Sequence, residues 1–170
     1  PHLHLSTRRQ LQMCIRDRKY GPSPGRGAVL IGLGSLGRKR LHSKSDLDLI
    51  LIYDAAGVEA SSGEKSIDSR TYYARLTKSM VAAIGAPMTE ISLFQVDMRL
   101  RPSGNQGPVA TSWEAFKHYQ ISEAWVWEHL ALVNATIIAG PIGLQNDVSE
   151  FCESLKTLRP VSYTHLTLPT

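Results

Sequence analysis

The sequence predicts an α+β fold. Two short apolar runs, at residues 28–31 and 47–54, have the length and the Leu, Ile and Val content of buried strands. A third run, at 93–100, alternates in part and indicates another strand. Apolar residues recur at helical spacing along 68–84 and again beyond residue 112. The chain has 170 residues, which is long enough for one domain with a core of its own.

Turn signals separate the strands of the first half. Residues 22–27 form a Pro- and Gly-rich entry to the first strand, and residues 32–37 form a Gly-rich turn after it. The following residues, 38–44, are polar and basic and too few for a long helix. The second strand ends at Asp54, and residues 55–67 form a loop.

The first long helix is predicted to begin near Asp68. Gly85-Ala86-Pro87 ends it, and one apolar face carries Tyr72, Leu76, Met80 and Ile84.

Three further helical segments are predicted after the strand at 93–100. Ser112 is the expected N-cap of the first of them. The second covers 122–135, and the last covers 144–158. In the second, Trp125, Trp127 and Leu130 are expected to lie in a helix core.

Composition excludes several classes of protein. No apolar run approaches the roughly 18–20 residues that cross a bilayer, so no membrane partner is expected. Two cysteines without metal-type spacing fit a reducing compartment, and we expect a cytoplasmic protein. Residues 1–18 and 161–170 resemble translated adapter sequence and are expected to be non-native tails. The first tail holds four arginines and one aspartate, so the remainder is nearly neutral and predicts no nucleic-acid partner.

Asp46 and Asp48 open the second strand and are the most informative pair of residues. Side chains at i and i+2 of a strand point the same way, so these carboxylates would lie roughly 6–7 Å apart. They would repel each other unless a cation lay between them, and oxygen ligands suit Mg²⁺. In the alternative interpretation, Asp46 is a local cap and Asp48 a solvated charge at the strand end.

Gly32-Leu33-Gly34-Ser35-Leu36-Gly37 matches the G-x-G-x-x-G fingerprint of dinucleotide-binding proteins. That interpretation requires a crossover helix before the next strand, and residues 38–44 cannot supply one. Alternatively, Gly34 and Ser35 present backbone N–H groups and a hydroxyl to phosphate oxygens. Two carboxylates about eleven residues later then suggest metal-dependent chemistry on nucleotide phosphates.

Asp97 is a third candidate ligand, within the apolar run 93–100. A two-metal site needs a further acidic group on a neighbouring strand. Arg99 and Arg101 follow at i+2 and i+4, on the same predicted strand face. A structural Asp97–Arg99 ion pair is the alternative explanation.

Together these segments resemble the glutamine synthetase adenylyltransferase family, whose catalytic domains are similar to DNA polymerase β. The resemblance covers roughly residues 28–140. Its motifs are Gly34-Ser35-Leu36-Gly37, Ser45-Asp46-Leu47-Asp48-Leu49, Tyr72-Tyr73-Ala74-Arg75-Leu76, Val96-Asp97-Met98-Arg99-Leu100-Arg101-Pro102-Ser103-Gly104 and Glu123-Ala124-Trp125-Val126-Trp127-Glu128-His129-Leu130-Ala131-Leu132. The family more often has Lys in place of Ser35 and Gly in place of Arg38.

The resemblance implies a mixed sheet with flanking helices, a nucleotidyltransferase domain at 19–140 and the start of a helical domain at 141–160. It implies an enzyme that transfers AMP from ATP to a tyrosine hydroxyl of glutamine synthetase, as part of a larger bifunctional protein that a PII-type regulator controls. Asp46, Asp48 and Asp97 would hold two Mg²⁺ ions. Gly34 and Ser35 would contact the leaving phosphates, and Arg99 and Arg101 would stabilise phosphate charge or fix the carboxylates.

Three other functions stay open at this point. The first is the deadenylylating, phosphorolytic copy within the same family, although the motifs around residues 99–105 and 123–129 resemble the adenylylating copy. The second is an inert fragment or a non-catalytic binding module. The third, a nicotinamide-binding domain, conflicts with the short segment 38–44.

Overall fold

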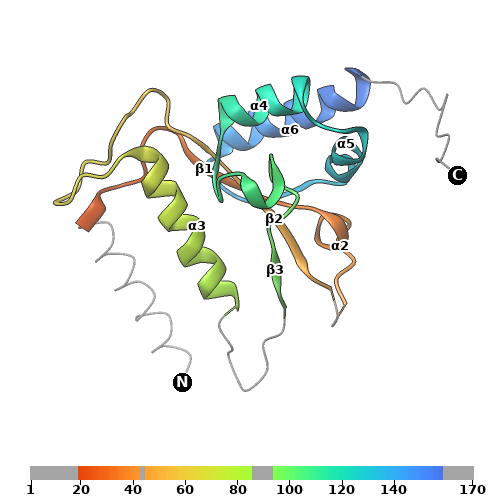
Figure 1. The fold of residues 1–170 in the computed structure, drawn as a ribbon, viewed down its shortest axis with the longest axis horizontal. Helices are drawn as coiled ribbons and strands as arrows, with labels where there is room; N and C mark the ends of the chain where they lie inside the picture. The colour runs from red at the N-terminus through yellow and green to blue at the C-terminus, as the bar shows by residue number, and fades with distance from the viewer. Residues whose placement is uncertain (1–18, 43–44, 86–93, 159–170) are drawn as a thin grey trace, which may run out of the picture.

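The computed structural model describes residues 19–42, 45–85 and 94–158. It is an α+β domain, as the sequence predicts (Figure 1). In chain order its elements are β1 (Gly27–Gly32), α2 (Gly34–Gly37), β2 (Leu47–Asp54), α3 (Ser69–Gly85), β3 (Val96–Asp97), a 3₁₀ turn (Gly104–Gln106), β4 (Thr111–Ser112), α4 (Trp113–Ser122), α5 (Val126–Val133), β5 (Thr136–Ala139) and α6 (Ile142–Leu158).

The sheet is mixed and has the order β3-β2-β1-β5. β1 pairs antiparallel with both β2 and β5, whereas β3 and β4 pair parallel with the two ends of β2. The antiparallel β1–β2 pair confirms that the Gly-rich turn is not part of a dinucleotide-binding βαβ unit, in which consecutive strands are parallel.

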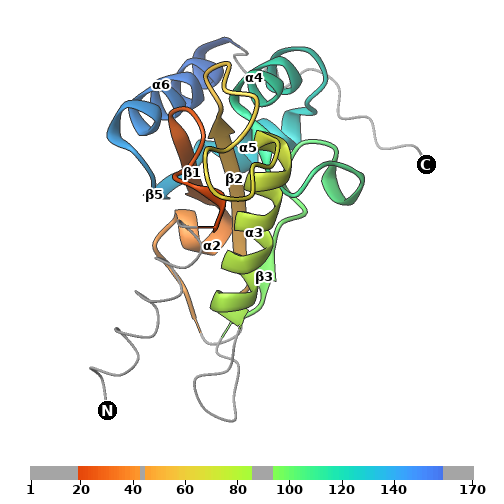
Figure 2. The same cartoon turned by 90° about the vertical axis from the view of Figure 1, so that its left-hand side faces the viewer.

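Each face of the sheet is covered by helices (Figures 1 and 2). Alternate residues of β1 and β2 point to opposite faces, so the two strands supply two cores. One core joins them to α4, α5 and α6, and its members include Val29, Ile31, Ile50, Ile52, Phe116, Leu132, Leu144 and Val148. The other joins them to α3, through Leu51, Tyr53, Tyr72 and Tyr73.

The limits of several predicted elements agree with the structure. α3 begins at Ser69 and ends at Gly85, within a residue of the prediction. Ser112 is the N-cap of α4, and its Oγ accepts a hydrogen bond from the amide of Ala115 at 3.3 Å. α6 begins two residues before the predicted start.

The strand predicted at 93–100 is shorter than expected. β3 covers only Val96–Asp97, and Arg99 and Leu100 already lie in a turn. Residue 93 lies outside the described residues. Here the Asp97 carboxylate accepts a hydrogen bond of 2.8 Å from the backbone amide of Arg99. This bond closes a local Asx turn, which ends the strand. Arg99 and Arg101 are therefore not on a strand, contrary to the sequence-based expectation.

The segment predicted as one helix, 122–135, is divided. α5 covers only Val126–Val133, and β5 follows it from Thr136. The expectation of a helix core was wrong for the aromatic residues of this segment. Trp125 is 71% exposed and Trp127 56% exposed, and Leu130 is exposed as well. Leu132 is the side chain that α5 contributes to the core.

The predicted tails at 1–18 and 161–170 lie outside the described residues. The division at residue 140 stays a prediction, although Leu144 and Val148 of α6 pack onto β1 in the same core as Ile31. None of the helices in the described residues is both long and apolar enough to cross a bilayer.

Candidate functional site

Two of the predicted carboxylates lie directly opposite each other on neighbouring strands. β2 and β3 are parallel, and their register pairs Asp48 with Asp97. Residues in register on adjacent strands point to the same face. Asp46 lies just before β2, which begins at Leu47, and is exposed. The sheet therefore brings Asp48 and Asp97 together, and Asp46 is near enough to influence the charge of Asp48.

The three carboxylates influence one another electrostatically. The pKa of Asp48 is raised, first because the group is partly buried and then because Asp97 and Asp46 lie close to it; Arg99 opposes the shift. Like charges that raise a carboxyl pKa mark a site with too little positive charge. A divalent cation would supply that charge.

Arg99 is bonded to one member of this acidic group, Asp97. Its Nε and Nη2 donate to Oδ2 of Asp97, at 2.8 and 2.5 Å, and its amide donates to Oδ1. These bonds lower the pKa of Asp97, chiefly through the Arg99 side chain. The pKa of Arg99 is raised by Asp97 and, more weakly, by Asp46 and Asp48. The ion pair considered as an alternative explanation for Asp97 is thus present, and Arg99 also interacts electrostatically with Asp46 and Asp48.

The Gly-rich turn lies against the same carboxylates. The amide of Leu33 donates to the carbonyl of Asp48 at 2.9 Å. Gly34 has φ +54°, and a side chain added there would overlap the carboxylate of Asp48. Gly34 and Ser35 begin the four-residue helix α2, which ends at Gly37. The turn and the acidic strand therefore form one contiguous site, and Gly34 is required both by its conformation and by its neighbour.

Leu33 helps to fix the Gly-rich turn against β2, and the sequence reasoning missed this role. It acts through its backbone amide, and a backbone contact leaves no mark on the choice of side chain. Only the strand register, which joins Gly32 to Leu49, could have indicated it.

Arg101 has a different environment from Arg99. It is buried, and its Nη1 donates to the carbonyl of Met98 at 2.6 Å. Nε and Nη2 face the carbonyl of Gly107 at 3.4 Å. Arg101 therefore holds the turn after β3 together, and its charge helps to lower the pKa of Asp97 from a distance.

The site offers the donor chemistry of a divalent cation. Carboxylates such as Asp46, Asp48 and Asp97 are oxygen ligands of the kind that Mg²⁺ takes. Within the described residues no group of three or more acidic, histidine or cysteine side chains is already close enough to hold a metal ion. Asp97 is engaged by Arg99, so a cation would compete with the guanidinium for that carboxylate.

Comparison with known proteins identifies close relatives. The chain matches the model of the glutamate-ammonia ligase adenylyltransferase family over residues 3–150. It is 46% identical over 140 residues to a bifunctional glutamine synthetase adenylyltransferase/adenylyl-removing enzyme of Agrobacterium fabrum. The aligned region covers 82% of this chain and 14% of that protein. Proteins of the same name show 50% identity over 125 residues in Brucella suis and 46% over 145 residues in Rhizobium meliloti.

These relatives are much longer than the chain. The aligned part spans 14% of the Agrobacterium protein, 13% of the Brucella protein and 15% of the Rhizobium protein. The family match covers most of the chain, including the Gly-rich turn and all three carboxylates. The chain therefore belongs to the glutamate-ammonia ligase adenylyltransferase family.

Proposed function

We propose that this chain forms the nucleotidyltransferase part of an enzyme that transfers AMP from ATP to a tyrosine hydroxyl of glutamine synthetase and releases pyrophosphate. One observation carries the proposal: Asp48 and Asp97 lie in register on parallel strands, next to Asp46 and against the Gly-rich turn. The relatives' name combines adenylyltransferase and adenylyl-removing activity on glutamine synthetase, so it supports the class of reaction and leaves its direction to experiment.

Asp46, Asp48 and Asp97 would hold Mg²⁺. When bound, the metal would neutralise phosphate charge and lower the pKa of the attacking tyrosine hydroxyl. Partial burial of Asp48 strengthens its attraction for a cation, because water screens the charge less there.

The remaining residues position the substrate. Backbone N–H groups at Gly34 and Ser35, with the Ser35 hydroxyl, would contact the leaving phosphates. Arg99 is 70% exposed at its side chain, so it can turn from Asp97 toward phosphate oxygens. Arg101 would keep the turn that carries Arg99 in place, through Met98 and Gly107. In-line displacement at the α-phosphorus depends mainly on such positioning and on charge neutralisation.

The proposal extends to the partners. Glutamine synthetase would be the acceptor, a PII-type protein would regulate the longer enzyme, and both encounters would take place in the cytoplasm. Neither nucleic acid nor a membrane has a part in it.

The first test is calorimetric titration of the chain with ATP, with and without Mg²⁺. We expect binding only in the presence of Mg²⁺. Asp46→Asn should weaken that binding at least tenfold, because one ligand charge is lost. Asp46 is exposed, so the variant should fold normally. Glu150→Gln, an exposed change on α6, is the matched control. Equal affinity of Asp46→Asn and the wild type would contradict the assignment.

The direction of the reaction needs a second assay. The chain is incubated with glutamine synthetase and ATP labelled in the α-phosphate, and transfer of label to the protein supports the proposal. Release of ADP from adenylylated glutamine synthetase in the presence of phosphate would instead identify the adenylyl-removing activity.

A further inference from the structure

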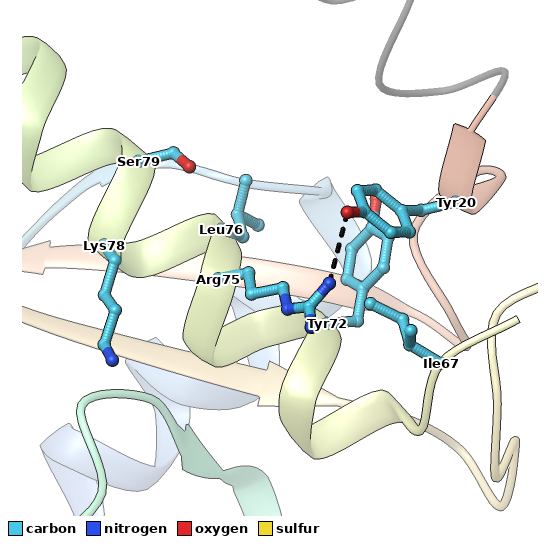
Figure 3. A pocket seen from close by; sticks show the side chains of 7 residues that line it. All are labelled: Tyr20, Ile67, Tyr72, Arg75, Leu76, Lys78 and Ser79. Carbon is cyan, nitrogen blue, oxygen red and sulfur yellow. Dashed lines mark hydrogen bonds between the residues drawn. The ribbon is translucent and has the colours of Figure 1, made fainter. Parts of the chain in front are cut away.

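A pocket lies beside the middle of α3, where the helix faces Tyr20 (Figure 3). Its volume of about 380 Å³ is in the range of small-molecule sites. The residues that line it are Tyr20, Ile67, Tyr72, Arg75, Leu76, Lys78 and Ser79. None of them belongs to the carboxylate site, and the proposed AMP transfer gives none of them a role.

Positive charge gathers around the pocket in the part of the chain that the structure describes. Lys19 Nζ lies 5.2 Å from the centroid of the Tyr20 ring, and the Arg75 guanidinium carbon lies 5.5 Å from it. A ring attracts such cations but leaves their charge intact. In the described parts of the chain, the ion pairs of the structure include neither these two residues nor Lys78.

The phenol of Tyr20 reports the same excess. Its pKa is lowered, chiefly by the contact with Lys19 and further by Arg75, and no carboxylate is among the causes.

The pocket combines hydrogen-bond donors with an apolar wall. Arg75 Nη1 donates to the hydroxyl oxygen of Tyr20 at 3.1 Å, so the hydroxyl proton of Tyr20 can itself be donated outward. Arg75 has further N–H groups for a planar anion. Ile67 and Leu76 supply apolar lining, from different segments of the chain, and Lys78 lies one turn along α3 (Figure 3).

We propose that this pocket binds a small organic anion. Its carboxylate or phosphate meets Arg75 and the Tyr20 hydroxyl, Lys78 adds long-range attraction, and its apolar part packs against Ile67 and Leu76. The site is independent of the proposed catalytic function, since it shares no residue with the carboxylate cluster.

The test is an NMR titration of the isotope-labelled chain with three probes: phenyl phosphate, benzoate and uncharged benzyl alcohol. We expect saturable shifts in the amides of residues 72–79 with the anions and none with the alcohol. The tighter of the two anions identifies phosphate or carboxylate as the natural group. Absence of saturable shifts with both anions, or shifts confined to residues 33–48 of the carboxylate site, would overturn the proposal.

Variants separate the pocket from general charge effects. Arg75→Gln should weaken binding of the preferred anion roughly tenfold or more. Tyr20→Phe keeps the ring and removes only the hydroxyl, so a smaller loss is expected. Arg70→Gln removes an exposed charge of the same helix that does not line the pocket, and should change the affinity less than twofold. Equal effects of Arg75→Gln and Arg70→Gln would reduce the pocket to a nonspecific positive surface and refute the site.

Discussion

At the start of β2, Asp48 combines partial burial with two like-charged neighbours, Asp46 and Asp97. The spacing of Asp46 and Asp48 in the sequence predicted their common direction, because a strand repeats every two residues. It could not predict the bonds from Arg99 to Asp97, since those depend on a turn that the apolar pattern of 93–100 concealed. The sequence therefore predicted that these acidic residues lie near one another, but not the guanidinium that accompanies them; their role as ligands stays a prediction.

Asp48→Asn should stabilise the isolated chain at pH 7, by about 0.5 kcal/mol after allowance for solvent screening. The raised pKa of Asp48 means that folding disfavours its ionised form. The resulting penalty is absent when the group is protonated in both states, and it grows as the pH rises through the ordinary pKa toward the raised one. Thermal unfolding at several pH values measures this penalty. The melting temperature of the variant should be higher than that of the wild type at pH 7 and equal to it near pH 3. A lower melting temperature at pH 7 would contradict the repulsion. The same variant should lose Mg²⁺-dependent ATP binding.

At the scale of single elements, length and periodicity predicted most of the structure. The apolar face and the Gly85 stop defined α3 because both signals are local. β5 was missed because the residues before it, up to Asn134, recur at helical spacing. The cluster of β-branched residues at 136–138, closed by Gly140 and Pro141, was the available strand signal. Exposure of Trp125 and Trp127 was not readable, because a pattern of apolar residues does not say which side of a short helix is covered.

The connection between α4 and α5 depends on Glu128, which is buried. Its Oε1 accepts from the Tyr119 hydroxyl and its Oε2 accepts from the Trp125 amide, both at 2.8 Å. Glu128→Gln can preserve only one of these bonds, because its amide nitrogen does not accept. We expect a loss of about 1–3 kcal/mol in the free energy of unfolding by urea. Glu123→Gln, in the same connection but exposed, should change it by less than about 0.5 kcal/mol. Similar losses in both variants would show that Glu128 contributes only through its charge.

The whole molecule depends on a central pair of strands with helices on each face. β1 and β2 contribute residues to both cores, so a destabilising substitution in either core weakens the packing of the same two strands. α6 belongs to this arrangement through Leu144, Val148 and Leu155. We therefore expect α6 to unfold together with the sheet and not as a separate unit.

Leu144→Ala tests that expectation. Leu144 is 1% exposed, and its truncation should lower the free energy of unfolding by about 2–5 kcal/mol. Ile142→Ala changes a residue of the same helix that is 75% exposed, and should have little effect. Denaturation followed by far-UV circular dichroism should show one transition in each protein. Two separate transitions would indicate that α6 is an independent element.

The hydrogen bond from the Leu33 amide to the Asp48 carbonyl has a mechanical consequence. It fastens the loop after β1 to the acidic end of β2, while Gly34 leaves no gap between them. Under the proposed function, a nucleotide held there would meet this loop already fixed against β2 and would need no closure of it. On the β3 side the Arg99 side chain is 70% exposed, so a bound phosphate would draw it from Asp97 without moving the sheet.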